Sequence, residues 1–231
     1  MNKIVALLPM KANSTRVPGK NFKEFCGKPL FKWVLDTLLS VSEIDKVIIN
    51  TDAKEILLEN GLVESNRIII RQRPDEICGD EISMNRVIED DVQNVSSEIY
   101  LMTHTTNPLL SRKTIIEAIN KFKMESTDIG VDSVFTVNKI QTRFYRADGS
   151  AINHDPDNLI PTQNLEPWFE ENSNLYLFTA ESFSKTKARI GERPAMLETP
   201  LIESLDIDTP DEWDMGVNIT NYLLATGKIE N

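Results

Sequence analysis

Two groups of charged side chains, far apart in the chain, have the residue types that phosphate chemistry needs. Between Met10 and Val34 there is one acid, Glu24, and there are six bases: Lys11, Arg16, Lys20, Lys23, Lys28 and Lys32. The whole chain instead carries 36 acids and 25 bases, a net charge of −11. Cations gathered in one loop offset the repulsion among phosphates, so the segment is a candidate polyphosphate site. The alternative is a solvated basic loop.

The second group is a pair of carboxylates, Asp206 and Asp208. In a strand, residues two apart share a face, so both carboxylates can point at one place while Leu205 and Ile207 enter the core. Paired oxygen ligands suit Mg²⁺, which binds through one or two carboxylates together with substrate phosphates. A basic loop and a carboxylate pair together indicate a nucleotidyltransferase site that uses Mg²⁺.

The residues after the carboxylate pair have a structural interpretation. Thr209, Pro210 and Glu212 form the pattern of a helix capping box with proline at the first helical position. Asp211 suits the positive end of that helix. Helix capping therefore explains Asp211 and Glu212 and leaves the carboxylate pair for chemistry.

The elements that must position these groups alternate along the chain. Apolar runs predict strands over residues 4–8, 46–50, 67–70, 98–102 and 133–137, and helical periodicity predicts helices over 30–39, 53–60, 84–95 and 113–122. This order is typical of an α/β fold with a doubly wound, mostly parallel sheet. Ligands bind beyond the carboxyl ends of such strands, which is where the basic loop follows the first strand.

The pattern changes after residue 138. We expect a hairpin over 142–153 with its turn at Asp148-Gly149, a polar arm over 154–174, a strand over 175–179 and a closing helix over 209–225. The arm contains five acids and no lysine or arginine. We therefore predict a single domain over residues 1–231 with an inserted lobe at approximately 138–174.

Composition excludes several classes of protein. The negative net charge disfavours nucleic acid and membrane partners, and no apolar run approaches the roughly 20 residues of a membrane span. The basic loop lacks both the GxGxxG and the GK[ST] patterns, which disfavours dinucleotide binding and P-loop ATPase activity. Only two cysteines occur, Cys26 and Cys78, with no nearby histidine, so we expect neither zinc nor disulfides, and a cytoplasmic location.

Five segments in chain order resemble motifs of one enzyme family. They are residues 11–21 (KANSTRVPGKN), 26–30 (CGKPL), 73–80 (RPDEICGD), 171–176 (ENSNLY) and 206–209 (DIDT). Nearly the whole chain is thereby similar to the acylneuraminate cytidylyltransferases, the CMP-sialic-acid synthetase family. The resemblance implies transfer of CMP from CTP to the anomeric hydroxyl of a sialic-acid-like 2-keto sugar acid, with release of pyrophosphate, by a homodimer that uses the arm for dimerisation. The polarity of the arm and its Trp168-Phe169 pair lead us to expect that it completes the active site of the partner subunit, and the alternative is a mobile surface loop.

The resemblance also implies roles for individual residues. Lys20, Asp206 and Asp208 would be catalytic, and the two aspartates would hold Mg²⁺. The nucleotide would contact Lys11, Asn13, Ser14, Arg16, Lys20, Asn21, Arg73, Asp80, Ser83 and His104. The sugar would contact Gln163, Asn172 and Tyr176.

The chain departs from the family pattern at several of these motifs. Lys11 and Thr162 replace arginines, His104 replaces a glutamine, and Glu170 and Glu171 stand where one basic residue is usual. Two alternatives therefore stay open: nucleotide transfer to another sugar or sugar phosphate, and a non-catalytic module that binds nucleotide sugars. The intact carboxylate pair argues against the second.

Overall fold

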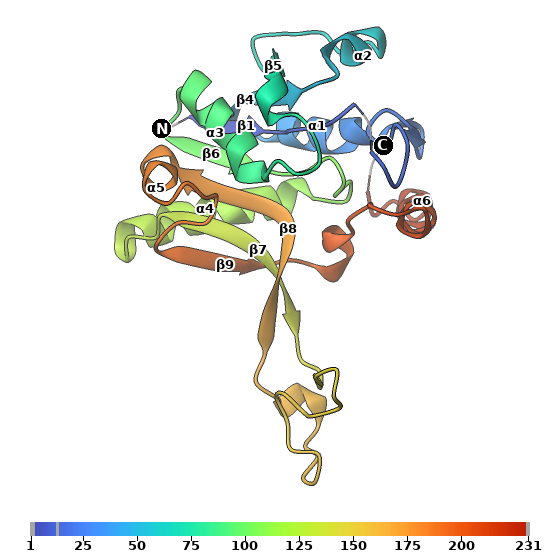
Figure 1. Cartoon of the computed structure of the whole chain (residues 1–231), viewed down its shortest axis with the longest axis vertical. Coiled ribbons are helices and arrows are strands. Elements are labelled where there is room, and N and C mark those ends of the chain that lie inside the picture. The colour runs from blue at the N-terminus through green and yellow to red at the C-terminus, as the bar shows by residue number, and fades with distance from the viewer. Residues whose placement is uncertain (1–2, 13, 230–231) are drawn as a thin grey trace.

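The computed structural model describes residues 3–12 and 14–229. Its central sheet has the strand order β5-β4-β1-β6-β8-β7-β9 (Figure 1). The strands are β1 (Ile4–Leu7), β4 (Ile44–Thr51), β5 (Ile68–Gln72), β6 (Ile99–Met102), β7 (Ser133–Ile140), β8 (Trp168–Thr179) and β9 (Pro194–Glu198). β8 is antiparallel to both β6 and β7, and the other neighbouring pairs are parallel. The expected mostly parallel α/β sheet is confirmed.

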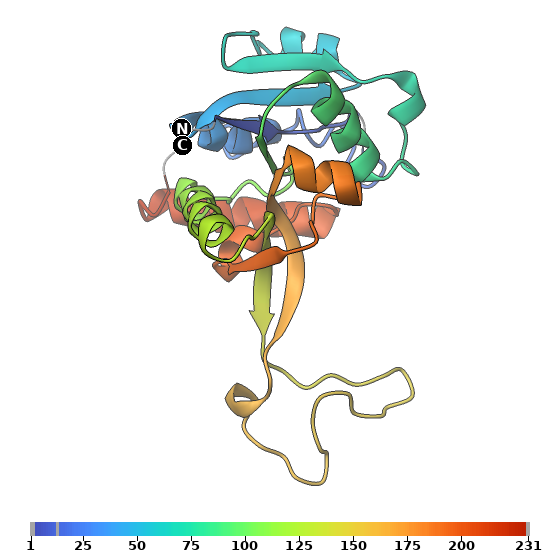
Figure 2. The same ribbon diagram turned by 90° about the vertical axis from the view of Figure 1, so that its left-hand side faces the viewer.

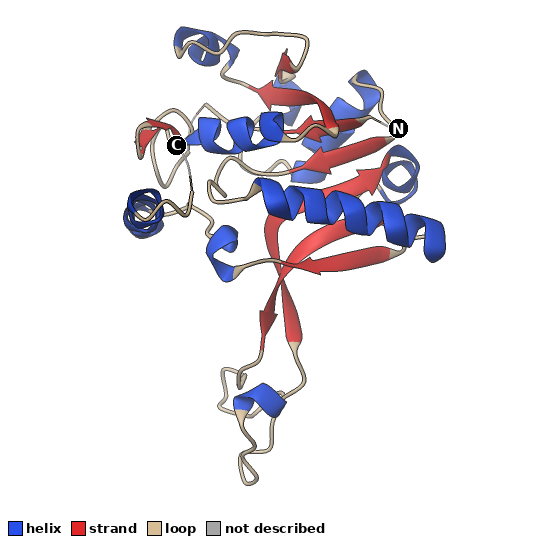
Figure 3. Ribbon diagram, turned by 180° about the vertical axis from the view of Figure 1, so that it is seen from behind, coloured by secondary structure: helices blue, strands red, loops and turns tan. Residues whose placement is uncertain are grey.

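Helices cover both faces of this sheet. Figures 1 and 3 view it from opposite sides, with α3 (Met84–Asn94) and α5 (Ala180–Thr186) in front in one and α1 (Leu30–Ser40) and α4 (Arg112–Asp128) in front in the other. The surroundings of β1 explain why its sequence is apolar throughout. Ile4 and Ala6 pack in the cluster on the α1 and α4 side, whereas Val5 and Leu7 pack in the cluster on the α3 and α5 side.

The remaining elements are short or peripheral. α2 (Lys54–Glu59) contacts β5, and β2 (Glu24–Phe25) pairs with β3 (Lys28–Pro29) as a two-stranded ribbon. The described residues also form the 3₁₀ turns η1 (Asp75–Ile77), η2 (Thr162–Asn164) and η3 (Leu201–Ser204). Within the described ranges, no helix is long and apolar enough to cross a membrane.

A third apolar cluster joins the two ends of the chain. Helix α6 (Pro210–Ala225) contributes Trp213, the segment before it contributes Ile207, and the N-terminal part contributes Phe25 and Trp33. The rings of Phe25 and Trp213 meet edge to face, with centroids 5.4 Å apart. This packing holds the segment that carries Asp206 and Asp208 beside the basic loop.

Strands β7 and β8 run beyond the sheet as a two-stranded stem, and residues 141–167 protrude from its end (Figures 1 and 2). The expected hairpin over 142–153 forms only a turn with one isolated bridge, Tyr145 to Ala151, and Gly149 has the positive φ of 84° that the turn needs. The end of the expected arm is also different, because residues 168–174 belong to β8. Residues 168–171 pair with β7, and the register then shifts, with Ser173 at a positive φ of 55°.

Two further differences concern the region after residue 179. Helix α5 and strand β9 have no counterpart among the expected elements. Asp206 and Asp208 lie in an extended segment between η3 and α6, outside any strand. The side-chain alternation expected there nevertheless exists, because Ile207 is fully buried while both aspartates line a pocket.

Candidate active site

The strand order reverses beside β1. The chain builds β1, β4 and β5 in one direction and then returns to place β6 on the other side of β1. Loops that leave the carboxyl ends of β1 and β6 diverge at such a point and leave a crevice between them. A pocket of about 380 Å³ occupies it, lined by Pro9, Met10, Lys11, Ser14, Thr15, Arg16, Lys20, Asn21, Arg73, Asp80, Met84, His104, Thr105, Thr106, Ser173, Asp206 and Asp208.

A larger cavity of about 810 Å³ lies at the opposite end of the strands, near the start of β6 and the end of β8. Its lining includes Ser97, Lys123, Asp132 and Ser182 and, in the described part of the chain, none of the predicted site residues. The crevice at the strand-order reversal therefore takes precedence, since it gathers the cations and carboxylates that the chemistry requires.

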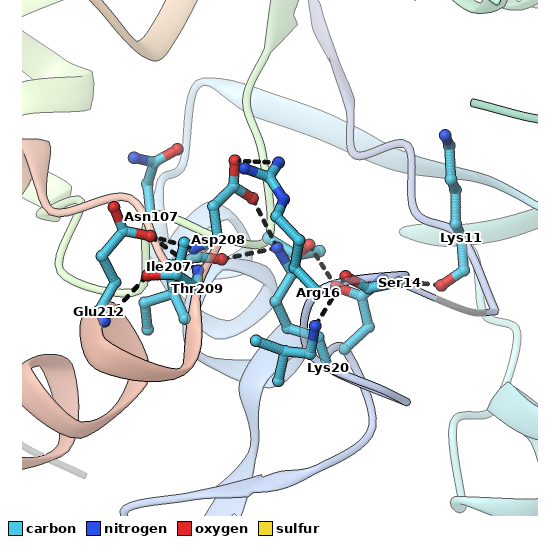
Figure 4. Close-up of polar contacts among 12 residues, drawn as sticks. Lys11, Ser14, Arg16, Lys20, Asn107, Ile207, Asp208, Thr209 and Glu212 are labelled. Atoms are coloured by element: carbon cyan, nitrogen blue, oxygen red, sulfur yellow. Dashed lines mark hydrogen bonds and ion pairs between the residues drawn. The ribbon is translucent and has the colours of Figure 1, made fainter. Parts of the chain in front are cut away.

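The carboxylate of Asp208 lies between two cations of the basic loop (Figure 4). Arg16 Nη2 is 2.7 Å from Asp208 Oδ2, and Lys20 Nζ is 2.8 Å from Oδ1. Lys20 also donates to the carbonyl oxygen of Ile207 at 2.6 Å. Burial alone would raise the pKa of Asp208, but Lys20 and Arg16 outweigh it and hold that pKa below its ordinary value.

Asp206 has a different environment in the same pocket. Its Oδ1 is buried and, among the described residues, has no hydrogen-bond partner. Burial raises the pKa of Asp206, a hydrogen bond with Thr106 opposes this, and the charge of Asp208 adds to it. A buried carboxylate oxygen without a donor fits a cation ligand, because a cation would satisfy the lone pairs that the protein leaves unbonded. The pair of aspartates therefore fits Mg²⁺.

The capping box is confirmed and serves the site as well as the helix. Thr209 Oγ1 accepts from the backbone N–H of Glu212 at 3.3 Å, and Glu212 Oε2 accepts from the backbone N–H of Thr209 at 2.8 Å. The same Glu212 oxygen accepts from the backbone N–H of Asp208 at 2.9 Å. The start of α6 thus fixes the backbone of the carboxylate pair.

Lys11 connects the basic loop to the segment after η1. Its Nζ donates to Asp80 Oδ1 at 2.9 Å and to the carbonyl oxygen of Gly79 at 3.0 Å. Asp80 is two-thirds exposed, so the pair lies at the mouth of the pocket. In this structure Lys11, Arg16 and Lys20 are thus each paired with a carboxylate, and a bound triphosphate would have to replace those partners.

Two predicted nucleotide-binding residues hold the backbone of the pocket. The buried Arg73 donates from Nη2 to the carbonyl oxygens of Met10 at 3.2 Å and Asn50 at 2.8 Å. Asn21 donates to the carbonyl oxygen of Lys11 at 2.8 Å and accepts from the Thr105 hydroxyl at 2.7 Å. Both line the pocket, yet these polar atoms bond to the protein, so the structure gives the two residues a positioning role.

His104 lies on the pocket wall beside β6. Burial lowers its pKa to about 4, and the positive charge of Arg189 acts in the same direction. The imidazole is therefore neutral near pH 7 and can both donate and accept a hydrogen bond. Of the other predicted nucleotide contacts, Ser14 lines the pocket, Ser83 is the exposed N-cap residue of α3 outside the lining, and Asn13 lies outside the described residues.

The three predicted sugar contacts do not line the pocket of their own chain. Gln163 is exposed on the arm, where its carbonyl oxygen accepts from Gln141 Nε2 at 3.2 Å. Asn172 is buried and donates to Asn138 and to Thr199, at 3.0 and 2.8 Å. Its amide therefore ties strands together.

Tyr176, the third predicted sugar contact, has a buried ring and a hydroxyl that donates to Glu171 and reaches Ser173 Oγ at 3.2 Å. Burial and the bond to Glu171 raise the pKa of Tyr176 to about 12, so the phenol stays protonated. Ser173, which the motif spacing passes over, does line the pocket.

Several residues in or beside the pocket escaped the sequence reasoning. Thr105 and Thr106 follow the strand at 98–102, so the strand-end rule that drew attention to the basic loop points to them as well. Arg189, whose charge reaches His104, comes from the connection between α5 and β9, two elements absent from the expected list. Its sequence context carries no signal that separates it from a surface arginine.

Comparison with known proteins finds relatives that match most of this chain. The CMP-N,N'-diacetyllegionaminic acid synthase of Legionella pneumophila is 25% identical over 219 residues, which cover 91% of this chain and 93% of that protein. The N-acylneuraminate cytidylyltransferase of Streptococcus agalactiae serotype V is 24% identical over 220 residues, which cover 91% of this chain and 52% of that protein. The pseudaminic acid cytidylyltransferase of Campylobacter jejuni is 23% identical over 155 residues, covering 65% of this chain and 66% of that one.

Solved structures share the fold. CMP:2-keto-3-deoxy-manno-octonic acid synthetase complexed with CTP superimposes with a TM-score of 0.67 at 16% identity, over 95% of this chain and 99% of that one. The 4-diphosphocytidyl-2C-methyl-D-erythritol synthase of Anaerococcus prevotii gives 0.66 at 14% identity, over 95% and 96%. Residues 5–214 match the family model described as Cytidylyltransferase. The chain is a nucleotidyltransferase and belongs to the cytidylyltransferase family.

Proposed function

We propose that the protein transfers CMP from CTP to the anomeric hydroxyl of a sialic-acid-like 2-keto sugar acid and releases pyrophosphate. The observation that carries the proposal is the meeting of Arg16 and Lys20 with Asp206 and Asp208 in the crevice where the strand order reverses. Relatives named for legionaminic, neuraminic and pseudaminic acids support the class of acceptor.

The chemistry is a displacement at the α-phosphorus. The sugar hydroxyl oxygen forms the new P–O bond and loses its proton, while the bond to the β-phosphate bridge breaks and its electrons leave with pyrophosphate. Lys11, Arg16 and Lys20 would stabilise the charge on the leaving phosphates. Asp206 and Asp208 would hold Mg²⁺, which when bound neutralises phosphate charge and lowers the pKa of the attacking hydroxyl. Phosphate oxygens that take the donors of Arg16 and Lys20 would free Asp208 for this role.

His104 contributes to base recognition in this proposal. A neutral imidazole on the pocket wall can donate to a cytosine carbonyl or accept from its amino group. With a pKa of about 4 it is a weak proton acceptor, which argues against a role as general base.

The test is a pyrophosphate-release assay with Mg²⁺, each of the four nucleoside triphosphates and a panel of 2-keto sugar acids and sugar 1-phosphates. We expect turnover with CTP and a sugar acid, and a loss of several powers of ten in the folded Asp208→Asn variant. Turnover with a sugar 1-phosphate alone would move the protein to another class of nucleotidyltransferase. No pyrophosphate from any pair, with CTP still bound in calorimetry, would favour a non-catalytic binding module.

We also propose a homodimer that uses the arm. Trp168 and Phe169 at the stem are 39% and 45% exposed, a large apolar area that a second copy could cover. Sedimentation equilibrium of the wild type and of the Trp168→Ser/Phe169→Ser variant tests this. A wild type that is monomeric at micromolar concentration yet active would contradict it. A cytoplasmic location also remains a prediction, supported by two cysteines that form no disulfide in the described residues.

A further inference from the structure

Arg189 is a cation near the pocket that belongs neither to the basic loop nor to the partners of Asp206 and Asp208. It lies in the connection between α5 and β9, and its side chain is 21% exposed. The guanidinium carbon lies 4.0 Å from the centroid of the Tyr176 ring. Stacking on a buried aromatic ring restricts the orientation of the planar guanidinium while its edge stays available for hydrogen bonds.

A short series of contacts leads from Arg189 to the pocket. Arg189 Nη2 is 3.4 Å from Glu171 Oε1, and the Tyr176 hydroxyl donates to the same oxygen. That hydroxyl also reaches the oxygen of Ser173, which lines the pocket. In the segment after β6, His104 lines the pocket, and the charge of Arg189 contributes to its lowered pKa.

The position of Arg189 separates it from the phosphate-binding cations. Arg16 and Lys20 come from the loop after β1, and β6 lies between β1 and β8 in the sheet. Arg189 stacks on a residue of β8, two positions from β1 in the sheet, so it lies apart from the cations of the loop after β1. Its partner Glu171 is 42% exposed and the contact is long, so an incoming anion can replace it at little cost.

We propose that Arg189 binds the carboxylate of the acceptor sugar acid, taking the place that Glu171 occupies in the absence of substrate. The proposal rests on the proposed function. A guanidinium presents two parallel N–H groups that match the two oxygens of a carboxylate, and such bidentate pairs are among the strong polar contacts in proteins. Arg189 would thus give the chain an arginine for the acceptor carboxylate, although position 162, an arginine in the family motif, is a threonine here.

The first test measures pyrophosphate release by the wild type, Arg189→Lys and Arg189→Met, with Arg193→Met as a matched control. Arg193 follows in the same connection, but its guanidinium lies against Gly130, in the lining of the distant 810 Å³ cavity. Hydrogen bonds to charged groups contribute about 1.5–3 kcal/mol, so we expect Arg189→Met to raise the acceptor KM about 10- to 100-fold. The acceptor KM of Arg189→Lys should lie between those of the wild type and Arg189→Met. The KM for CTP should stay within about twofold of the wild-type value in both variants.

A second measurement separates carboxylate binding from a purely structural role. The acceptor is compared with its carboxamide analogue, which keeps the shape and loses the charge. The wild type should prefer the carboxylate about tenfold or more, and Arg189→Met should lose that preference. Glu171→Gln, which keeps an acceptor for Tyr176 and removes the competing charge, should lower the acceptor KM by up to about fivefold.

The outcomes distinguish this inference from the function on which it rests. An active wild type whose discrimination between carboxylate and carboxamide survives in Arg189→Met overturns the role of Arg189 and leaves the proposed function intact. A wild type that turns over no sugar acid overturns both. Unfolding midpoints and CTP affinities for every variant exclude misfolding as the cause of a raised KM.

Discussion

The substitution Lys20→Met probes the contact that joins the two ends of the chain at the site. Lys20 Nζ bonds to the Ile207 carbonyl oxygen at 2.6 Å and to Asp208 Oδ1 at 2.8 Å, and the side chain is only 8% exposed. Methionine fills a similar volume, so the loss of packing is small and the loss of charge dominates.

The size of the effect follows from these two contacts. A buried hydrogen bond from a charged donor contributes about 1.5–3 kcal/mol, and the carbonyl of Ile207 loses its donor in the variant. The ion pair with Asp208 adds less, because that carboxylate is 35% exposed and keeps Arg16 as a partner. We therefore expect the free energy of unfolding to fall by about 2–4 kcal/mol.

The assay is urea unfolding followed by circular dichroism, combined with CTP titration by calorimetry. Lys23→Met is the matched control, because Lys23 is exposed and stacks on Trp213 at 4.3 Å, a contact of about 0.5–1 kcal/mol. A double-mutant cycle with Asp208→Asn measures the ion pair itself. Equal unfolding midpoints for the two lysine variants would refute this account of the contact, and so would strictly additive changes in the free energy of unfolding for Lys20→Met and Asp208→Asn. Unchanged CTP affinity in Lys20→Met would refute the phosphate role of Lys20.

Three further predictions concern a helix cap, a buried carboxyl group and the metal. Thr209→Ala, which removes the helix cap, should cost about 1 kcal/mol in urea unfolding, and an unchanged midpoint would contradict this. Burial raises the pKa of Asp91 from 3.8 to about 6, so the folded protein holds that proton more tightly than the unfolded chain does. The free energy of unfolding should therefore fall as the pH rises from about 4 to about 6, and it should fall less in Asp91→Asn. Equal pH dependence in the wild type and Asp91→Asn would show that Asp91 is not the cause. EDTA should stop pyrophosphate release, and added Mg²⁺ should restore it without a large change in melting temperature, whereas activity that persists in EDTA would end the proposed metal role.

Local patterns were enough to predict most of the sheet and the outline of the site. The apolar run at residues 4–8 predicts a strand buried on both faces, and clusters on both sides of β1 explain that run. The capping box at Thr209 is equally local, since its partners lie within three residues. Such features are readable because the physical cause, a repeat of apolar side chains or a cap, lies inside one short segment.

The irregular regions were less readable for the same reason. The short edge strand β9 contains a proline and alternates between exposed and half-buried residues, so little separates it from a loop until it pairs with β7. Residues 170–174 are all polar, and residues 168–171 become part of a strand only through their pairing with β7. Their conformation is decided by a neighbour far along the chain.

Residue types at the site indicate which bonds a side chain can form, and the tertiary structure decides with which partner. The types of Lys20 and Asp208 suggest phosphate and metal, but packing of Ile207 against the N-terminal part makes them partners of each other. Asn172 matches a sugar-binding motif, yet the register of β7 and β8 turns its amide onto Asn138. Arg189 resembles any surface arginine until the connection after α5 places it on Tyr176. Each of these pairings joins segments distant in sequence, and close packing of the whole chain determines which polar groups lose water together and must bond to one another.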